Sequence, residues 1–172
     1  MKRTAATELI PTIYGTPFGG GFLTGRFFIG ADAYALITSP RTEGDYEPQV
    51  WNNSSKKVAG ALSYCDGLAN TDAMAKAGSQ LAKRIHGLRI GGFKDWYLPS
   101  REEQLLQFYN LSTAKGFAKG GAQCLGPTWY WSSTQHASDA SYAWSQYFGY
   151  GSQDSLGKGY LCRARAVRRI KI

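Results

Sequence analysis

The sequence predicts an α+β fold in which two or three helices pack on small antiparallel sheets. The 172 residues include 21 Gly, 8 Phe, 11 Tyr and 5 Trp, a composition that favours turns and strands over a helical bundle. The order of elements agrees: a hairpin comes first, helical periodicity follows, and short strand-like runs close the chain. Helices and strands are therefore segregated along the chain and do not alternate.

The length and composition indicate a globular protein. A chain of 18.9 kDa can bury its own core, and 43% hydrophobic with 19% charged residues excludes a disordered polymer. No apolar run approaches the ~20 residues of a membrane span, and the basic N-terminus lacks the apolar stretch of a secretory signal. We expect no membrane insertion, and buried thiols at Cys65, Cys124 and Cys162 in a protein made in a reducing cytoplasm.

The first twenty residues lack a clear period and end in PFGGG. We interpret residues 1–20 as an N-terminal arm or docking segment, with simple fraying as the alternative, and residues 21–172 as the folded domain. The segment FLTGRFFIGADAYALITSP contains two β-rich runs around a Gly-Ala-Asp turn, which predicts a hairpin.

Helical periodicity begins at Val58. Apolar residues at helical spacing predict an amphipathic helix over residues 58–69, with Cys65 on its buried stripe. A second helix is expected to begin at Asn70 or Thr71, either of which can cap it, and to stop at Gly87.

A third helix is predicted after the segment GGFKDWYLP. Gly91 and Gly92 allow a tight turn, and Ser100 with Glu103 has the spacing of a capping box. The expected apolar residues of this helix are Leu105, Leu106, Tyr109 and Leu111.

Three strand-like runs follow a glycine-rich connector: WYWSST, YAWSQYFGYGSQDS and YLCRARAVRRI. The last run belongs to a segment from Arg163 to Lys171 that holds five basic residues and no acid, in a chain of net charge +8. We expect a closing strand whose alternate basic residues face solvent. A phosphate-binding edge is the alternative, although alternating arginines need not form one patch, so no nucleic-acid partner is expected.

The sequence offers little for catalysis. It has no phosphate-binding P-loop, no HExxH and no GxSxG. His86 is expected to interact with a helix C-terminus, and His136 beside Asp139 is interpreted as an exposed loop residue, with a general base as the alternative. We therefore expect no enzyme, no catalytic residue, no metal and no cofactor.

The run from Tyr142 to Tyr160 combines aromatic and small polar residues. Strand alternation would place Trp144, Gln146 and Phe148 on one face and Ser145 and Tyr147 on the other. Antibody-combining sites use similar chemistry, in which tyrosines supply rigid contact area and small polar residues adapt their hydrogen bonds. Packing of these tyrosines in a small β core is the alternative.

Four segments in order, GGFKDWYLPSREEQ, WYWSSTQ, YAW-x-x-x-F-x-x-G and RARAVR, carry a family resemblance. From about Gly20 to Ile170 the chain resembles the DUF1566 family, which is related to the C-terminal domain of Legionella collagen-like protein. The opening segments GTPFGGGF and YALITSP resemble a subgroup found in phage and prophage genomes.

The resemblance implies a C-type-lectin-like fold. It assigns Trp96, Leu98, Trp131 and Arg168 to the structural framework, and a partly buried arginine needs acceptors such as backbone carbonyls or Asp95. The region 136–160 corresponds to the part of this fold that contacts ligands in receptor binders. Its candidate ligand-binding residues are His136, Asp139, Tyr142, Ser145, Tyr147, Tyr150, Gln153 and Asp154.

The chain departs from two members of the broader fold class. Only Asp139 and Asp154 are acidic in the last third, so the calcium-binding loop of true C-type lectins has no clear equivalent. Formylglycine-generating enzymes use a close cysteine pair, whereas Cys124 and Cys162 are 38 residues apart, which makes an oxidase the less favoured interpretation.

The leading hypothesis is a non-enzymatic binding module of a phage or prophage virion that recognises a host-cell glycan or protein. The alternative is a capsid decoration or head or tail fibre protein anchored by its N-terminal arm. The expected partners are other virion proteins of the capsid or tail, and both hypotheses are compatible with a homo-oligomer. The protein would be made in the bacterial cytoplasm and located in the virion.

Overall fold

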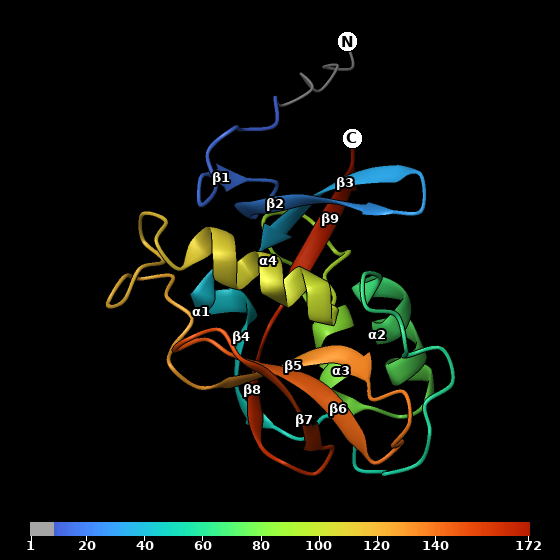
Figure 1. Ribbon diagram of the computed structural model, residues 1–172. Coiled ribbons are helices and arrows are strands. Elements are labelled where there is room, and N and C mark those ends of the chain that lie inside the picture. Colours follow the sequence, from blue (N-terminus) through green and yellow to red (C-terminus); the bar gives the residue numbers. More distant parts are fainter. Residues whose placement is uncertain (1–8) are drawn as a thin grey trace.

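Two sheets with a helix between them form the computed structural model, which describes residues 9–172 (Figure 1). The first sheet is antiparallel and has the order β1-β2-β3-β9. Its strands are β1 (Pro17–Phe18), β2 (Gly21–Ile29), β3 (Asp32–Thr38) and β9 (Val167–Lys171). The chain thus closes by placing its last strand against the early hairpin.

The second sheet has the order β4-β8-β5-β6-β7, in which only β5 and β8 are parallel neighbours. Its strands are β4 (Asp45–Gln49), β5 (Trp129–Gln135), β6 (Tyr142–Tyr147), β7 (Gln153–Gly157) and β8 (Cys162–Arg165). The predicted single closing strand is therefore two strands in different sheets. The chain passes from the second sheet to the first at buried Ala166, whose N–H donates to Gly44 O and whose carbonyl accepts from Ser39 N.

The early hairpin is confirmed, because β2 and β3 pair from Phe22–Thr38 to Ile29–Asp32 with a bulge at Thr24. Part of the segment assigned to an arm also lies on this sheet: β1 pairs with β2, and Gly15 N donates to Leu23 O at 2.8 Å. Residues 1–8 of that segment lie outside the described residues.

The helix predicted over residues 58–69 is wrong. Residues 58–66 are irregular, since Gly60 has φ +90°, and α2 (Gly67–Lys76) begins only after Asp66, whose carboxylate accepts from Ala69 N at 2.9 Å. Val58 and Ala61 are nevertheless buried in the core, whereas Cys65 is only half-buried. The apolar spacing indicated burial correctly but did not require a helix.

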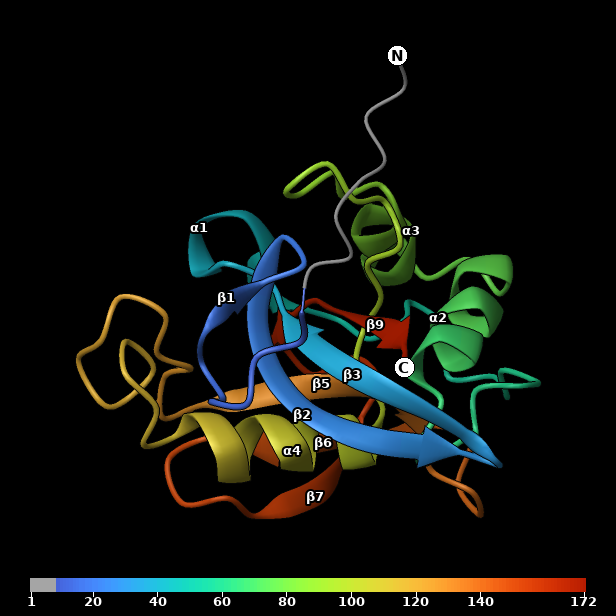
Figure 2. The same cartoon turned by 90° about the horizontal axis from the view of Figure 1, so that it is seen from above.

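The second predicted helix is two helices. Gly78 has φ +96°, which interrupts the helical backbone after α2, and Ser79 caps α3 (Gln80–His86). The Ser79 hydroxyl also donates to Trp51 O at 2.6 Å, which ties this break to the core. Gly87 follows the last residue of α3, as predicted. Figure 2 shows α2 and α3 side by side, across the molecule from the connector 112–128.

The helix predicted after the segment GGFKDWYLP is α4 (Arg101–Leu111), which lies between the two sheets (Figure 1). Its predicted capping box is present. Its buried face is more polar than predicted: Glu103, Gln104 and Gln107 are buried, while Tyr109 is exposed. The physical reason is that α4 meets sheet backbone on both sides. Gln104 Nε2 donates to Trp131 O at 2.9 Å, and elsewhere along the helix an amide donates to β2.

The core gathers three tryptophans from distant parts of the chain. Trp51, Trp96 and Trp131 are fully buried together with Leu98. Two of their indoles are held by backbone: Trp51 Nε1 donates to Ser132 O, and Trp131 Nε1 to Gln49 O, each at 2.8 Å. These bonds join the segment around β4 to β5.

The expectation that alternate basic residues of the closing segment face solvent holds for Lys171 and is wrong for the four arginines, whose side chains are largely buried against carboxylates. Arg165 and Arg168 are buried, and Arg168 binds both oxygens of Asp95, the acceptor suggested from sequence, at 2.8 and 2.9 Å. The ion pairs are Arg163 with Asp45 and Glu47, Arg165 with Asp45, Arg168 with Asp95, Arg169 with Asp66, and Lys171 with Asp32. The basic residues are therefore partnered within the fold.

The remaining short helix is α1 (Arg41–Gly44), which connects the two sheets before β4. None of the helices among residues 9–172 has both the length and the apolar character needed to cross a bilayer.

Candidate functional site

An open groove of about 690 Å³ lies where β6 begins and β7 ends. One wall comes from the turn after β7 and the residues before β6, and the other from the loop between β4 and α2. The lining residues are Val50, Asn52, Asn53, Ser55, Ser141, Tyr142, Gly157, Lys158, Gly159 and Tyr160. The groove is thus built mainly from amides, hydroxyls and two tyrosines.

Lys158 holds the two walls together. It is 2% exposed, and its ammonium donates to Lys56 O at 2.9 Å and to Gln135 Oε1 at 2.7 Å while lying 4.7 Å from the Trp51 ring centre. Burial lowers the pKa of Lys158 to about 8. The side chain is therefore a structural cross-link under the groove that begins to lose its charge in mildly alkaline solution.

The rim of the groove presents aromatic and polar groups to solvent. Tyr160 is 64% exposed, and Tyr142, Asn53 and Ser55 are also exposed. Aromatic rings can pack on the apolar faces of sugar rings, while amides and hydroxyls can bond to their hydroxyl groups. Such a surface suits a neutral, hydroxyl-rich ligand.

A stack of side chains surrounds Trp144, which lies two residues along β6 from Tyr142. The Arg101 guanidinium lies 3.7 Å from the Trp144 ring centre and 5.1 Å from that of Tyr64, and the His136 ring lies 5.5 Å from Trp144. Gln153 fixes this arginine, because it accepts from Arg101 Nε at 2.7 Å and donates to Arg101 O at 2.8 Å. The predicted residue Gln153 is thus engaged in positioning Arg101.

The loop from His136 to Tyr142 is ordered by its own polar groups. Asp139 N donates to His136 Nδ1 at 3.1 Å, so neutral His136 carries its proton on Nε2. Ser141 donates to the Asp139 carboxylate through both its hydroxyl and its N–H, and these bonds lower the pKa of Asp139. The loop therefore presents an ionised Asp139 and leads directly into Tyr142 at the groove.

The structure separates the other candidate residues. Tyr147 and exposed Tyr150 stack on one another at the far end of β6, with ring centres 4.6 Å apart. At about 3.3 Å per residue, that end is roughly 17 Å from Tyr142. Ser145 is buried and donates to Asp154 O, whereas the Asp154 side chain is exposed. The middle of β6 is covered on both faces, because the neighbouring residues Ser145 and Gln146 are both buried.

Of the eight candidate ligand-binding residues, only Tyr142 lines the groove, and the other nine lining residues were not named from sequence. The loop residues Asn52, Asn53 and Ser55 come from a segment about 90 residues before β6, and Lys158 and Tyr160 lay in the region 136–160 without being chosen. The run of polar residues after Trp51, NNSSKK, is the signal that could have indicated a surface loop there.

No cysteine or histidine is among the described residues that line the groove. Burial raises the pKa of the Cys162 thiol to about 12, which disfavours the reactive thiolate. All three cysteines are unpaired thiols, and His86 is paired with Asp72 at 3.1 Å. Among residues 9–172, no three His, Cys, Asp or Glu side chains are grouped so that they could hold a metal ion.

The fold and the groove define an α+β domain of two sheets with a concave polar and aromatic surface. The chain belongs to the Lcl C-terminal domain family, whose family model matches residues 42–168. This span includes α4, the whole second sheet and every residue that lines the groove. The family resemblance noted in the sequence is thereby confirmed.

Among solved structures, the chain is similar to a fimbrial protein from Bacteroides ovatus ATCC 8483, with 13% sequence identity and a TM-score of 0.48. The match covers 78% of this chain and 35% of the fimbrial protein, so the chain spans about a third of that protein's length. None of the curated proteins compared with the chain matches it.

Proposed function

We propose that this protein is a non-enzymatic binding module of a phage or prophage virion, and that its groove binds a glycan of the host-cell surface. The observation that carries the proposal is the pairing of Tyr142 and Tyr160 with exposed Asn53 and Ser55 in one groove. The virion setting rests on the resemblance of GTPFGGGF and YALITSP to phage and prophage sequences.

The scaffold favours binding, because the walls of the groove are held before any ligand arrives. Lys158 bonds one wall to the other, and Lys158 N and O bond to Ser141 O and Trp51 N, each at 2.9 Å. A ligand that meets fixed tyrosines and amides loses less conformational entropy on binding than one that must order a loop.

The C-type-lectin-like assignment is part of this proposal. It is supported by the family resemblance and by a topology in which the last strand, β9, pairs with the hairpin near the start of the chain. The loops after β5 and β7 then extend from a closed scaffold, and this arrangement suits variable recognition surfaces.

A non-enzymatic role is supported by the chemistry of the groove. Its lining side chains include no carboxylate, thiol or imidazole, and its lysine is bonded to two oxygens. General acid–base or nucleophilic catalysis would need such groups to face a substrate.

Purified protein incubated with host cells, and with polysaccharide extracted from them, tests the proposal. We expect the variants Tyr142→Ala and Tyr160→Ala each to weaken binding by about tenfold, because truncation of a central aromatic contact typically costs more than 1 kcal/mol. Tyr109→Ala, an exposed tyrosine on α4, is the matched control and should bind like wild type.

Two outcomes would contradict the proposal. One is the absence of wild-type binding to cells and to polysaccharide. The other is binding to protease-treated cells that survives both groove substitutions. Loss of cell binding after protease treatment, together with no binding of wild type to the polysaccharide, would indicate a protein receptor and not a glycan.

The decoration role anchored by the N-terminus is tested by deleting residues 1–8. This deletion spares β1, which pairs with β2. If the shortened chain no longer joins virions yet still binds cells, residues 1–8 dock the domain and the groove recognises the host. Normal incorporation would exclude docking by these residues.

A further inference from the structure

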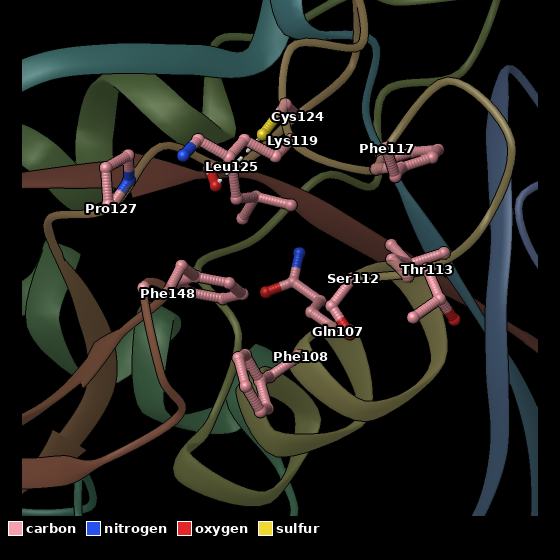
Figure 3. A pocket seen from close by; sticks show the side chains of 12 residues that line it. Gln107, Phe108, Ser112, Thr113, Phe117, Lys119, Cys124, Leu125, Pro127 and Phe148 are labelled. Atoms are coloured by element: carbon pink, nitrogen blue, oxygen red, sulfur yellow. Dashed lines mark hydrogen bonds between the residues drawn. The ribbon is translucent and has the colours of Figure 1, made fainter.

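A second cavity, of about 430 Å³, lies at the opposite end of β6 from the groove (Figure 3). Its walls come from the C-terminal half of α4, the connector that follows α4, and the turn after β6. The apolar lining residues are Phe108, Leu111, Phe117, Leu125, Pro127 and Phe148. A volume of this size is within the usual range for small-molecule sites.

The aromatic walls are fixed by edge-to-face contacts. Phe148 packs on Tyr130 with ring centres 5.0 Å apart, and Phe117 packs on Phe22 at 5.2 Å. Phe108 also contacts Phe148, at 6.2 Å, and leaves no room for a side chain at Gly151. These rings come from different elements that are each held by the core, so the cavity is preformed.

One polar group lies among these apolar side chains. Gln107 is 1% exposed, and Figure 3 shows its amide between Phe148 and Leu125. Its Nε2 donates to Thr38 Oγ1 at 3.0 Å, and its Oε1 has no hydrogen-bond partner among the described residues.

The orientation of this amide follows from the chain of bonds behind it. The Thr24 hydroxyl donates to Phe22 O, a carbonyl that can only accept, at 3.1 Å. The Thr38 hydroxyl must then donate to Thr24 Oγ1, at 2.7 Å, and accept from the Gln107 nitrogen. The group left without a partner is therefore an acceptor, and a buried acceptor without a donor is unfavourable.

The charge of the lining limits the ligand further. Lys119 is at the exposed edge, and none of the lining residues within 9–172 is acidic. A cationic ligand would meet this positive charge without a carboxylate to neutralise its own, and apolar walls disfavour any buried ion.

We propose that this cavity binds a small neutral phenol or apolar alcohol, with its hydroxyl donating to Gln107 Oε1 and its apolar body against Phe108, Phe148 and Leu125. The site is independent of the glycan groove, which lies at the other end of β6. Its specificity comes from one hydrogen bond to buried Gln107, because the other polar lining residues Ser112, Thr113 and Lys119 are exposed to solvent.

A matched ligand pair tests the proposal. The full chain is titrated with 4-butylphenol and with 4-butylanisole, which has the same ring and tail but no donor. Binding is followed by NMR through the methyl groups of Leu111 and Leu125. We expect both methyl signals to shift, and the phenol to bind at least about tenfold more tightly, because only the phenol supplies the missing donor.

Two variants locate the effect. Gln107→Leu removes the acceptor at similar volume and should reduce phenol affinity to that of the anisole. Leu125→Trp fills the cavity and should abolish both, while Tyr160→Ala, in the groove, should change neither. Equal affinities of the two compounds for wild type, no binding of either, or an unchanged phenol preference in Gln107→Leu would overturn the proposal. If Gln107→Leu does not fold, the wild-type preference and its loss in Leu125→Trp decide the question.

Discussion

Two polar strand regions, the closing segment 163–171 and the recognition region 136–160, have opposite fates in this fold. In the closing segment every basic residue bonds to a carboxylate, and Arg165 and Arg168 are buried. In the recognition region Tyr142, Tyr150 and Tyr160 are exposed and no ion pair is formed among the described residues. Most of the basic run is bonded within the fold, and the tyrosines of the recognition region are at the surface.

The difference shows that partners decide exposure more than polarity does. The carboxylates that bind the closing segment lie between Asp32 and Asp95, in segments that the two sheets bring to β8 and β9. A guanidinium that meets such a carboxylate can be buried, because its donors are satisfied. The exposed tyrosines Tyr142, Tyr150 and Tyr160 pair with no charged group among the described residues.

The substitution Asp45→Ala is the strongest test of whether carboxylate partners stabilise the closing segment. Asp45 is buried and accepts from both Arg163 and Arg165, so its removal leaves buried positive charge without a counter-ion. We expect a loss of about 3–5 kcal/mol in the free energy of unfolding, measured by urea denaturation. A loss below about 1 kcal/mol would mean that the closing segment is held by its backbone pairing alone.

A second test concerns Glu103, the buried carboxylate of the α4 capping box. Burial raises the pKa of Glu103 to about 7, although bonds from Tyr97 and Ser100 oppose the shift. Between about pH 4.5 and 7 the folded state then holds a proton that the unfolded state has released, so its contribution to stability falls as pH rises. Wild type should lose stability relative to Glu103→Gln across this window, in denaturation experiments at several pH values. Parallel pH profiles would contradict the raised pKa.

On the recognition side, Lys158→Met removes the cross-link under the groove. Loss of hydrogen bonds from a charged donor should cost about 1.5–3 kcal/mol near pH 7. Because the pKa of Lys158 is lowered to about 8, the unfolded state holds a proton that the folded state lacks between about pH 8 and 10. The stability of wild type relative to Lys158→Met should therefore rise over that range, as followed by thermal unfolding. If the difference in stability between wild type and Lys158→Met does not change with pH over this range, the pKa of Lys158 is not lowered.

The smallest effect is expected at the edge of the closing segment. Asp32 and Lys171 form an ion pair in which both side chains are about half exposed or more. Asp32→Ala should change the free energy of unfolding by less than about 1 kcal/mol. Urea denaturation beside Asp45→Ala gives the matched comparison, and a cost as large as that of Asp45→Ala would show that burial does not set the energetic order of these pairs.

Local signals in the sequence predicted several elements correctly. The hairpin around residues 30–32, the Gly91–Gly92 turn and the capping box at Ser100 and Glu103 each depend on residues close together in the chain. Their physical causes are backbone freedom at glycine and the satisfaction of free N–H groups at a helix start, which act without the rest of the fold.

Other predictions failed where distant contacts outweigh local periodicity. The apolar spacing of residues 58–69 is helical, yet Val58 N bonds to Gln135 and Ala61 O to Gln135 N in β5. Gly60 and Gly78 then adopt positive φ angles that end any continuing helix. The polar buried face of α4 likewise depends on the carbonyls of β2 and β5, which no local pattern encodes.

The sequence by itself determined the α+β class, the family and the residue types available for recognition, because composition, motifs and short-range turn chemistry are local properties of the chain. Tertiary structure alone decided which polar residues lie on the surface. It paired the closing arginines with acids between residues 32 and 95, brought the Asn52–Ser55 loop to Tyr142, and left the Gln107 oxygen without a partner in an apolar cavity. Each of these outcomes depends on contacts between residues far apart in the chain, and such contacts are defined only once the two sheets have closed around α4.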